Sequence, residues 1–89
     1  MKRIFAYEKT TTEQHQELIR EELKENNALH CFYEEFCVFN IGDYDVHIRL
    51  NDGNYFVLEP MEGFSTSYEV YKFEVMEQGA TVKYSGICY

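Results

Sequence analysis

The sequence predicts an α+β fold in which a single helix packs on a bent antiparallel sheet, in the order β-α-β-β-β-β-β. Three observations predict it. A helix-capping pattern follows the first alternating segment, Asp52-Gly53 separates two further alternating segments, and a last alternating pair surrounds Gln78-Gly79. With 89 residues the chain can build one hydrophobic core, so residues 1–89 are expected to form a single domain.

The first predicted elements are a short strand and the helix. Apolar and polar side chains alternate over residues 2–8, which predicts a strand. Thr10 and Glu13 then have the spacing of a capping box, so a helix is expected over residues 11–26. Its apolar side chains are few, namely Leu18, Ile19 and Leu23. Such a helix is marginal alone and must dock on the sheet.

The middle of the chain gives one open assignment and two definite ones. Residues 28–34 fit either a continued helix or a strand. Residues 36–41 are apolar on both faces, which predicts a central strand that is covered on both sides, with the helix on one of them. Residues 61–67 are expected to form a loop.

Two hairpins are expected to complete the sheet. A two-residue turn at Asp52-Gly53 would pair Leu50 with Tyr55, Ile48 with Val57, Val46 with Glu59, Arg49 with Phe56 and His47 with Leu58. Residues 68–76 and 80–89 form the second predicted hairpin. A turn at Gln78-Gly79 would pair Val75 with Val82, Phe73 with Tyr84, Val70 with Ile87 and Glu74 with Lys83.

The negative charge is concentrated in one part of the sequence. The chain has a net charge of −8, and residues 13–45 hold nine Asp or Glu against two Lys or Arg, a net charge of −7. This balance argues against direct binding of nucleic acid or of an anionic membrane, because both require Lys and Arg. Glutamates repeat every fourth residue along the predicted helix, at Glu13, Glu17, Glu21 and Glu25. Because like charges at this spacing oppose helix formation, we expect them to serve recognition of a basic partner.

The predicted partner-binding residues are the acids of this segment and two of the eight tyrosines. Tyrosine supplies large contact area at low entropic cost, and it is enriched at binding hot spots. The predicted set is Glu13, Glu17, Glu21, Glu22, Glu25, Glu34, Glu35, Asp43, Asp45, Tyr33 and Tyr44.

No motif for catalysis, a metal or a cofactor is recognisable, so we expect no enzyme and neither kind of ligand. The histidines and cysteines lack the paired spacing of a zinc site. Asp45 and His47 would share a strand face, but no nucleophile accompanies them. The odd number of cysteines, the early charges in the sequence and the lack of a long apolar run predict a cytoplasmic protein.

These features predict a small acidic cytoplasmic protein that inhibits or titrates a basic partner, with a nucleic-acid-binding enzyme as the expected class. In general character, and through no shared motif, the chain is similar to phage-encoded inhibitors that act as nucleic-acid mimics, anti-CRISPR proteins among them. The alternative is a homo-oligomeric module that binds a small molecule or nucleotide between subunits, using the tyrosine-rich sheet and Arg49.

Overall fold

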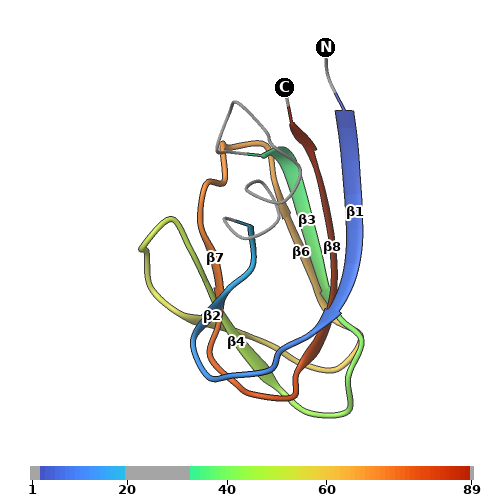
Figure 1. Cartoon of the computed structure of the whole chain (residues 1–89), viewed down its shortest axis with the longest axis vertical. Coiled ribbons are helices and arrows are strands. Elements are labelled where there is room, and N and C mark those ends of the chain that lie inside the picture. Colours follow the sequence, from blue (N-terminus) through green and yellow to red (C-terminus); the bar gives the residue numbers. More distant parts are fainter. Residues whose placement is uncertain (1–2, 20–32, 89) are drawn as a thin grey trace.

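The chain forms two antiparallel sheets of four strands each (Figure 1). The computed structural model describes residues 3–19 and 33–88, with the side chains of 4–19 and 33–87. The strands are β1 (Arg3–Thr10), β2 (Gln16–Glu17), β3 (Glu34–Asn40), β4 (Val46–Leu50), β5 (Phe56–Leu58), β6 (Gly63–Thr66), β7 (Phe73–Val75) and β8 (Thr81–Cys88). Sheet A has the order β1-β8-β3-β6, and sheet B has the order β2-β7-β4-β5.

The described residues contain no helical element, so the predicted α+β class is wrong and the fold is all-β. The two sheets pack face to face as a sandwich. The ring of Phe73 in sheet B lies 5.3 Å from that of Phe36 and 5.2 Å from that of Tyr84, both in sheet A. Inward-facing residues of β3, β4, β5, β7 and β8 complete the core, namely Val38, Val46, Ile48, Leu58, Val75 and Val82.

The segment predicted to begin the helix is instead tied to the rest of the sheet structure. Thr11 is buried, its N–H donates to the carbonyl of Ala80, and its hydroxyl donates to the carbonyl of Glu77. Gln16 then enters β2, which pairs with β7. The helix was marginal from the start, and these long-range hydrogen bonds outweigh its local preference. Residues 20–26 of the predicted helix lie outside the described residues.

The first predicted hairpin exists, but its register is shifted by one residue. β4 pairs with β5 through Val46↔Leu58, His47↔Val57 and Ile48↔Phe56. The turn is centred on Asn51 and Asp52, whose φ angles are 52° and 60°, as in a type I′ turn, and not on Asp52-Gly53. The shift places Leu58 in the core where the predicted register had placed Glu59.

The second predicted hairpin is wrong, because its two strands belong to different sheets. β7 pairs with β2 and β4, whereas β8 pairs with β1 and β3. Phe73 and Tyr84 do meet, but across the core and not along a strand pair. Glu74 faces Arg49 in the β4–β7 register, and Lys83 faces Glu8 in the β1–β8 register. The expected Glu74–Lys83 pair was therefore a coincidence of spacing.

The remaining strands confirm some predictions and correct others. The first strand is present as β1, and β3 lies inside sheet A between β8 and β6. The described residues leave one face of β3 uncovered, since the Phe39 side chain is 45% exposed. The predicted loop over residues 61–67 contains β6, which pairs with β3. Of the open segment 28–34, Tyr33 and Glu34 are extended, and residues 28–32 lie outside the described residues.

Candidate functional site

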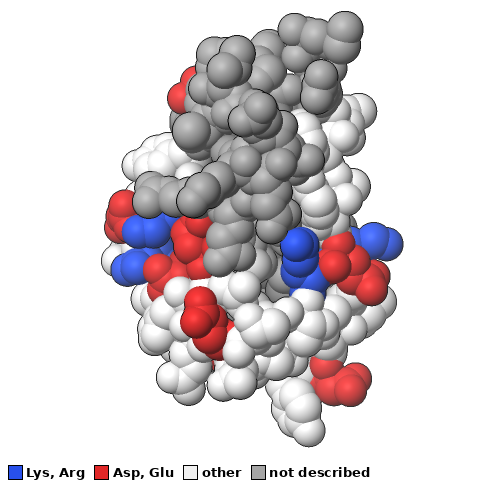
Figure 2. All heavy atoms as spheres, viewed as in Figure 1, with Lys and Arg blue, Asp and Glu red and all other residues white. Residues whose placement is uncertain are grey.

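Three connections between strands meet at one end of the sandwich. They are residues 41–45 between β3 and β4, residues 59–62 between β5 and β6, and residues 76–80 between β7 and β8. We call these residues the acidic end. They contain five carboxylates and no Lys or Arg, the acids being Asp43, Asp45, Glu59, Glu62 and Glu77. At the lower end of the view in Figure 2, acidic side chains lie without basic ones beside them.

The side chain of Asn40, fully buried, fixes the first two connections. Its Nδ2 donates to the carbonyls of Tyr44, at 2.7 Å, and Leu58, at 2.9 Å. Its backbone N–H donates to the carbonyl of Glu62 at 3.0 Å, and its carbonyl accepts from the N–H of Met61 at 2.7 Å. A buried amide with this many partners holds the loops in one arrangement.

Thr11 fixes the third connection in a comparable way. Its hydroxyl donates to the carbonyl of Glu77 at 2.6 Å and accepts from the N–H of Ala80 at 2.9 Å. Its carbonyl accepts from the N–H of Gly79 at 2.9 Å. The residue that the sequence placed at the start of a helix thus orders part of the acidic end.

A hollow of about 240 Å³ lies between the first and third connections. Asp43, Asp45 and Glu77 line it together with Tyr44, whose side chain is 84% exposed. Both oxygens of Glu77 are oriented by His47: Oε1 accepts its N–H at 2.8 Å, and Oε2 lies 2.6 Å from its Nδ1. His47 therefore pairs with Glu77. A catalytic arrangement of Asp45 and His47 would require His47 to pair with Asp45 instead.

The structure separates the predicted partner-binding residues. Asp43, Asp45 and Tyr44 lie together at the acidic end, whereas Glu13 and Glu17 lie before and within β2 and form no helical row. Glu17 is partly buried, and its Oε1 accepts the N–H of Phe73 at 3.2 Å. Glu34 and Glu35 are at the start of β3. The other three predicted acids, Glu21, Glu22 and Glu25, fall within residues 20–32, outside the described part.

Tyr33 is buried and not available to a partner. Its side chain is 1% exposed, and its ring lies 5.9 Å from that of Phe5. The sequence could not separate it from Tyr44, because an acid directly follows both tyrosines. The sequence did indicate part of the acidic end, through the turn composition around Asp43 and Asp45. It did not indicate Glu59, Glu62 and Glu77, because only the fold brings them close to Asp43 and Asp45.

A second polar cluster lies on the outer face of sheet B and was also missed from the sequence. Glu74 is only 6% exposed. Its Oε1 accepts from Arg49 at 2.7 Å, and its Oε2 lies 3.0 Å from Nδ1 of His15 and accepts from the hydroxyl of Tyr55. We call His15, Arg49, Tyr55 and Glu74 the Glu74 cluster.

Electrostatics show how strongly this cluster is paired. Burial alone would raise the pKa of Glu74, but the hydrogen bonds from Tyr55, Arg49 and His15 outweigh it and lower the pKa to about 2. The same hydrogen bonds to Glu74 raise the pKa of Arg49 and of Tyr55. The guanidinium of Arg49 also lies 4.8 Å from the Tyr55 ring centroid. Arg49, the residue that the alternative function would use, thus contacts Glu74 and Tyr55 of its own chain.

Two structural features are absent from the described residues. Among residues 3–19 and 33–88, no group of three His, Cys, Asp or Glu side chains could hold a metal ion. Within the same ranges, no helix is long and apolar enough to cross a membrane.

Comparison with protein-family models, curated proteins and solved structures finds no match to this chain. The similarity to phage inhibitors and anti-CRISPR proteins rested on general character alone and gains nothing from these comparisons. The α+β character that accompanied it is replaced by an all-β sandwich, so the likeness is not retained.

Proposed function

We propose that this chain is a binding protein that receives a basic side chain of a partner protein at the acidic end. The observation that carries the proposal is the hollow of about 240 Å³ that Asp43, Asp45 and Glu77 line beside the exposed ring of Tyr44. A carboxylate-lined hollow next to an aromatic ring favours one type of occupant, an Arg or Lys side chain.

The chemistry of the hollow fits a guanidinium better than an ammonium. Arginine pairs with carboxylates through two parallel hydrogen bonds and also stacks on aromatic faces. Asp43 and Asp45 would supply the carboxylates, and Tyr44 would supply the ring. The other acids of the acidic end, Glu59 and Glu62, would attract a positive surface over a longer range and speed its approach.

The acidic end is ordered before a partner arrives. Asn40 and Thr11 already hold the three connections by buried hydrogen bonds. Less conformational entropy is therefore lost on binding than with mobile loops. Nucleic-acid-binding proteins present clustered Lys and Arg, so they remain the class of partner that we propose. We also propose the cytoplasm as the compartment, because an odd number of cysteines suits a reducing environment.

The proposal is tested by titrating an arginine-rich peptide into ¹⁵N-labelled protein and following the amide signals by NMR. We expect the largest shifts within residues 41–45 and 76–80. The double variant Asp43→Lys/Asp45→Lys should weaken binding by at least about tenfold, which equals about 1.4 kcal/mol. Tyr44→Ala should weaken the binding of an arginine peptide more than that of a lysine peptide, because the stacking of the guanidinium on the tyrosine ring is lost.

The matched control is the double variant Glu35→Lys/Glu69→Lys. It changes the net charge by the same amount, but both side chains are exposed outside the acidic end. We expect it to reduce affinity only modestly, through long-range attraction that salt screens. Equal losses in both double variants would show that total charge and not the acidic end binds the peptide, and would contradict the proposal.

A further inference from the structure

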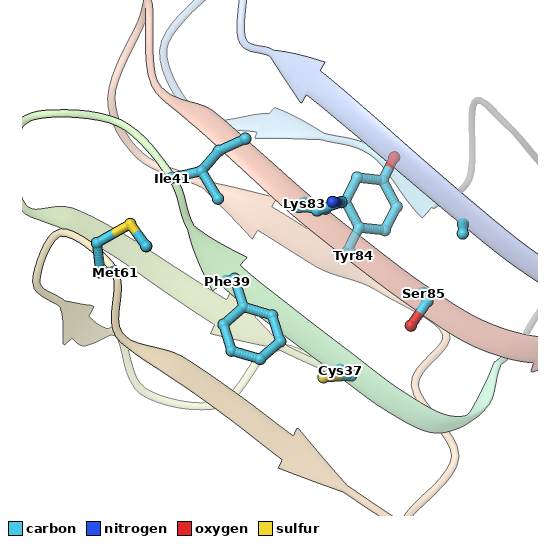
Figure 3. A pocket seen from close by; sticks show the side chains of 8 residues that line it. Cys37, Phe39, Ile41, Met61, Lys83, Tyr84 and Ser85 are labelled. Atoms are coloured by element: carbon cyan, nitrogen blue, oxygen red, sulfur yellow. The ribbon is translucent and has the colours of Figure 1, made fainter.

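A second hollow, lined mostly by apolar side chains, lies on the outer face of sheet A (Figure 3). Its volume is about 440 Å³, within the range of pockets that hold small organic ligands. The floor crosses neighbouring strands, since Ala6 of β1 is the register partner of Ser85 in β8, and Ser85 is the partner of Cys37 in β3. Because these three side chains are small, the sheet surface is lowered along this line.

Large apolar side chains form the wall of this trench. The ring of Phe39 lies over Gly63, where an added Cβ would approach ring atom Cε1 to 2.4 Å. Phe39 is 45% exposed and Met61 is 79% exposed, and Ile41 continues the same side. In Figure 3 the side chains of Phe39, Ile41 and Met61 lie along one side of the hollow. Apolar side chains left in water around a concave surface are typical of a ligand site.

The charge in the trench favours one sign of ligand. Among the described residues that line it, Lys83 is the only charged one. Within residues 3–19 and 33–88, Lys83 forms no ion pair. Its register neighbours are Phe39 on β3 and Glu8 on β1, so the ammonium group stands at the edge of the apolar wall. A ligand that matches this arrangement has an apolar chain and a carboxylate at one end.

We propose that the trench binds a free fatty acid, with its aliphatic chain on Ala6, Cys37 and Ser85 and its carboxylate at Lys83. Burial of the chain against Phe39, Ile41 and Met61 supplies the main driving force, at about 25 cal/mol per Å² of apolar surface. The charged hydrogen bond to Lys83 selects an anionic head group. Ile41 and Met61 of the wall belong to connections of the acidic end, but the trench uses none of the five carboxylates there, so the proposal does not depend on the function proposed for the acidic end.

The test is calorimetric titration of the protein with decanoate, and the amide NMR shifts of ¹⁵N-labelled protein locate the bound decanoate. Both are measured in 0.1 M salt, which screens the negative charge of the protein. We expect the largest shifts at Ala6, Cys37, Lys83 and Ser85. Lys83→Met should weaken decanoate binding at least about tenfold and remove the preference for decanoate over decyltrimethylammonium. Glu8→Gln should raise the affinity for decanoate several-fold, because it removes the carboxylate opposite Lys83.

Two further variants separate the trench from other effects. Ser85→Leu fills the floor from the solvent side and should abolish binding while the thermal midpoint stays close to that of the unchanged protein. Asp43→Lys/Asp45→Lys should bind decanoate at least as well as the unchanged protein does. Equal affinity of the unchanged protein for decanoate and for decyltrimethylammonium would overturn the proposal, as would decanoate binding that survives Ser85→Leu. Self-association through this face without decanoate binding would overturn it too.

Discussion

At the residue scale, the Glu74 cluster shows how a carboxylate becomes part of the fold. Glu74 lies on the outer face of sheet B, yet Arg49, Tyr55 and His15 cover it and occupy both of its oxygens. Arg49 is on β4, His15 precedes β2, and Tyr55 is in the segment before β5, so the cluster links β7 to both of its neighbouring strands and to the segment that leads into β5. Removing the carboxylate would leave a half-buried guanidinium without its charge partner.

Glu74→Gln should lower the free energy of unfolding at pH 7 by about 2–3 kcal/mol, measured by urea denaturation. The pKa of Glu74 is lowered from 4.5 to about 2 in the folded chain, so its contribution is complete above about pH 4.5 and is lost as the pH falls toward 2. The difference between the variant and the unchanged protein should therefore shrink over that range. An exposed control, Glu69→Gln, should change stability by less than about 0.5 kcal/mol. A difference that is constant from pH 7 to pH 2 would contradict this pairing.

A substitution at Gly86 tests how closely β8 packs against Tyr33. A Cβ at this position would lie 2.8 Å from Cβ of Tyr33, which is buried and cannot move aside. Gly86→Ala should therefore destabilise the chain by about 1–3 kcal/mol, seen as a lower midpoint of thermal unfolding. Gly42→Ala is the control, because its nearest contact would be an ordinary 3.5 Å. Similar effects of the two substitutions would be inconsistent with the described packing around Tyr33.

At the scale of elements, the sequence located several strands but not their partners. Alternation correctly indicated β1, β4 and β8, because one face of each is buried against the core, and a continuous apolar run indicated β3. It could not show that β7 and β8 lie in opposite sheets, since inward-facing residues of a hairpin and of two facing sheets alternate in the same way. The one-residue register error at the β4–β5 turn arose because Asn51 and Asp52 both adopt positive φ, which Asn and Asp tolerate better than most other non-glycine residues.

The part of the predicted helix that the structure describes as non-helical, residues 11–18, was wrong for a different reason. Local capping and propensity contribute only fractions of a kcal/mol per residue, and the hydrogen bonds of Thr11 and β2 to distant strands outweigh them. The acidic end was found in part, through Asp43, Tyr44 and Asp45, because these residues are adjacent in sequence. Glu59 and Glu77 come from other connections and join them only through the hydrogen bonds of Asn40 and Thr11.

Double-mutant cycles distinguish the sandwich from the predicted hairpin. The cycle of Arg49 and Glu74, each replaced by Ala, should give a coupling energy of at least about 1 kcal/mol, because the two side chains are in contact at 2.7 Å. The cycle of Glu74 and Lys83 should be additive within about 0.5 kcal/mol, because these residues lie in different sheets. Urea denaturation of the single and double variants supplies both numbers. A strong Glu74–Lys83 coupling would favour the hairpin and contradict the two-sheet arrangement.

At the scale of the whole molecule, the net charge of −8 is not a uniform property of the surface. On sheet B, Glu74 is paired with Arg49, and Asp52 is paired with Lys72 at 2.7 Å. At the acidic end, five carboxylates lie without Lys or Arg in the same three connections. In the part of the chain that the structure describes, these carboxylates thus gather on loops that the hydrogen bonds of Asn40 and Thr11 hold in place.

Capture of a basic protein from a cell lysate tests this account most directly. The unchanged chain, Asp43→Lys/Asp45→Lys and the charge-matched Glu35→Lys/Glu69→Lys are each immobilised, and bound proteins are identified by mass at low and high salt. We predict that the unchanged chain and the charge-matched control retain the same basic protein at low salt, that high salt releases it, and that Asp43→Lys/Asp45→Lys does not retain it. Retention by Asp43→Lys/Asp45→Lys, or equal loss from both variants, would contradict the assignment of binding to the acidic end.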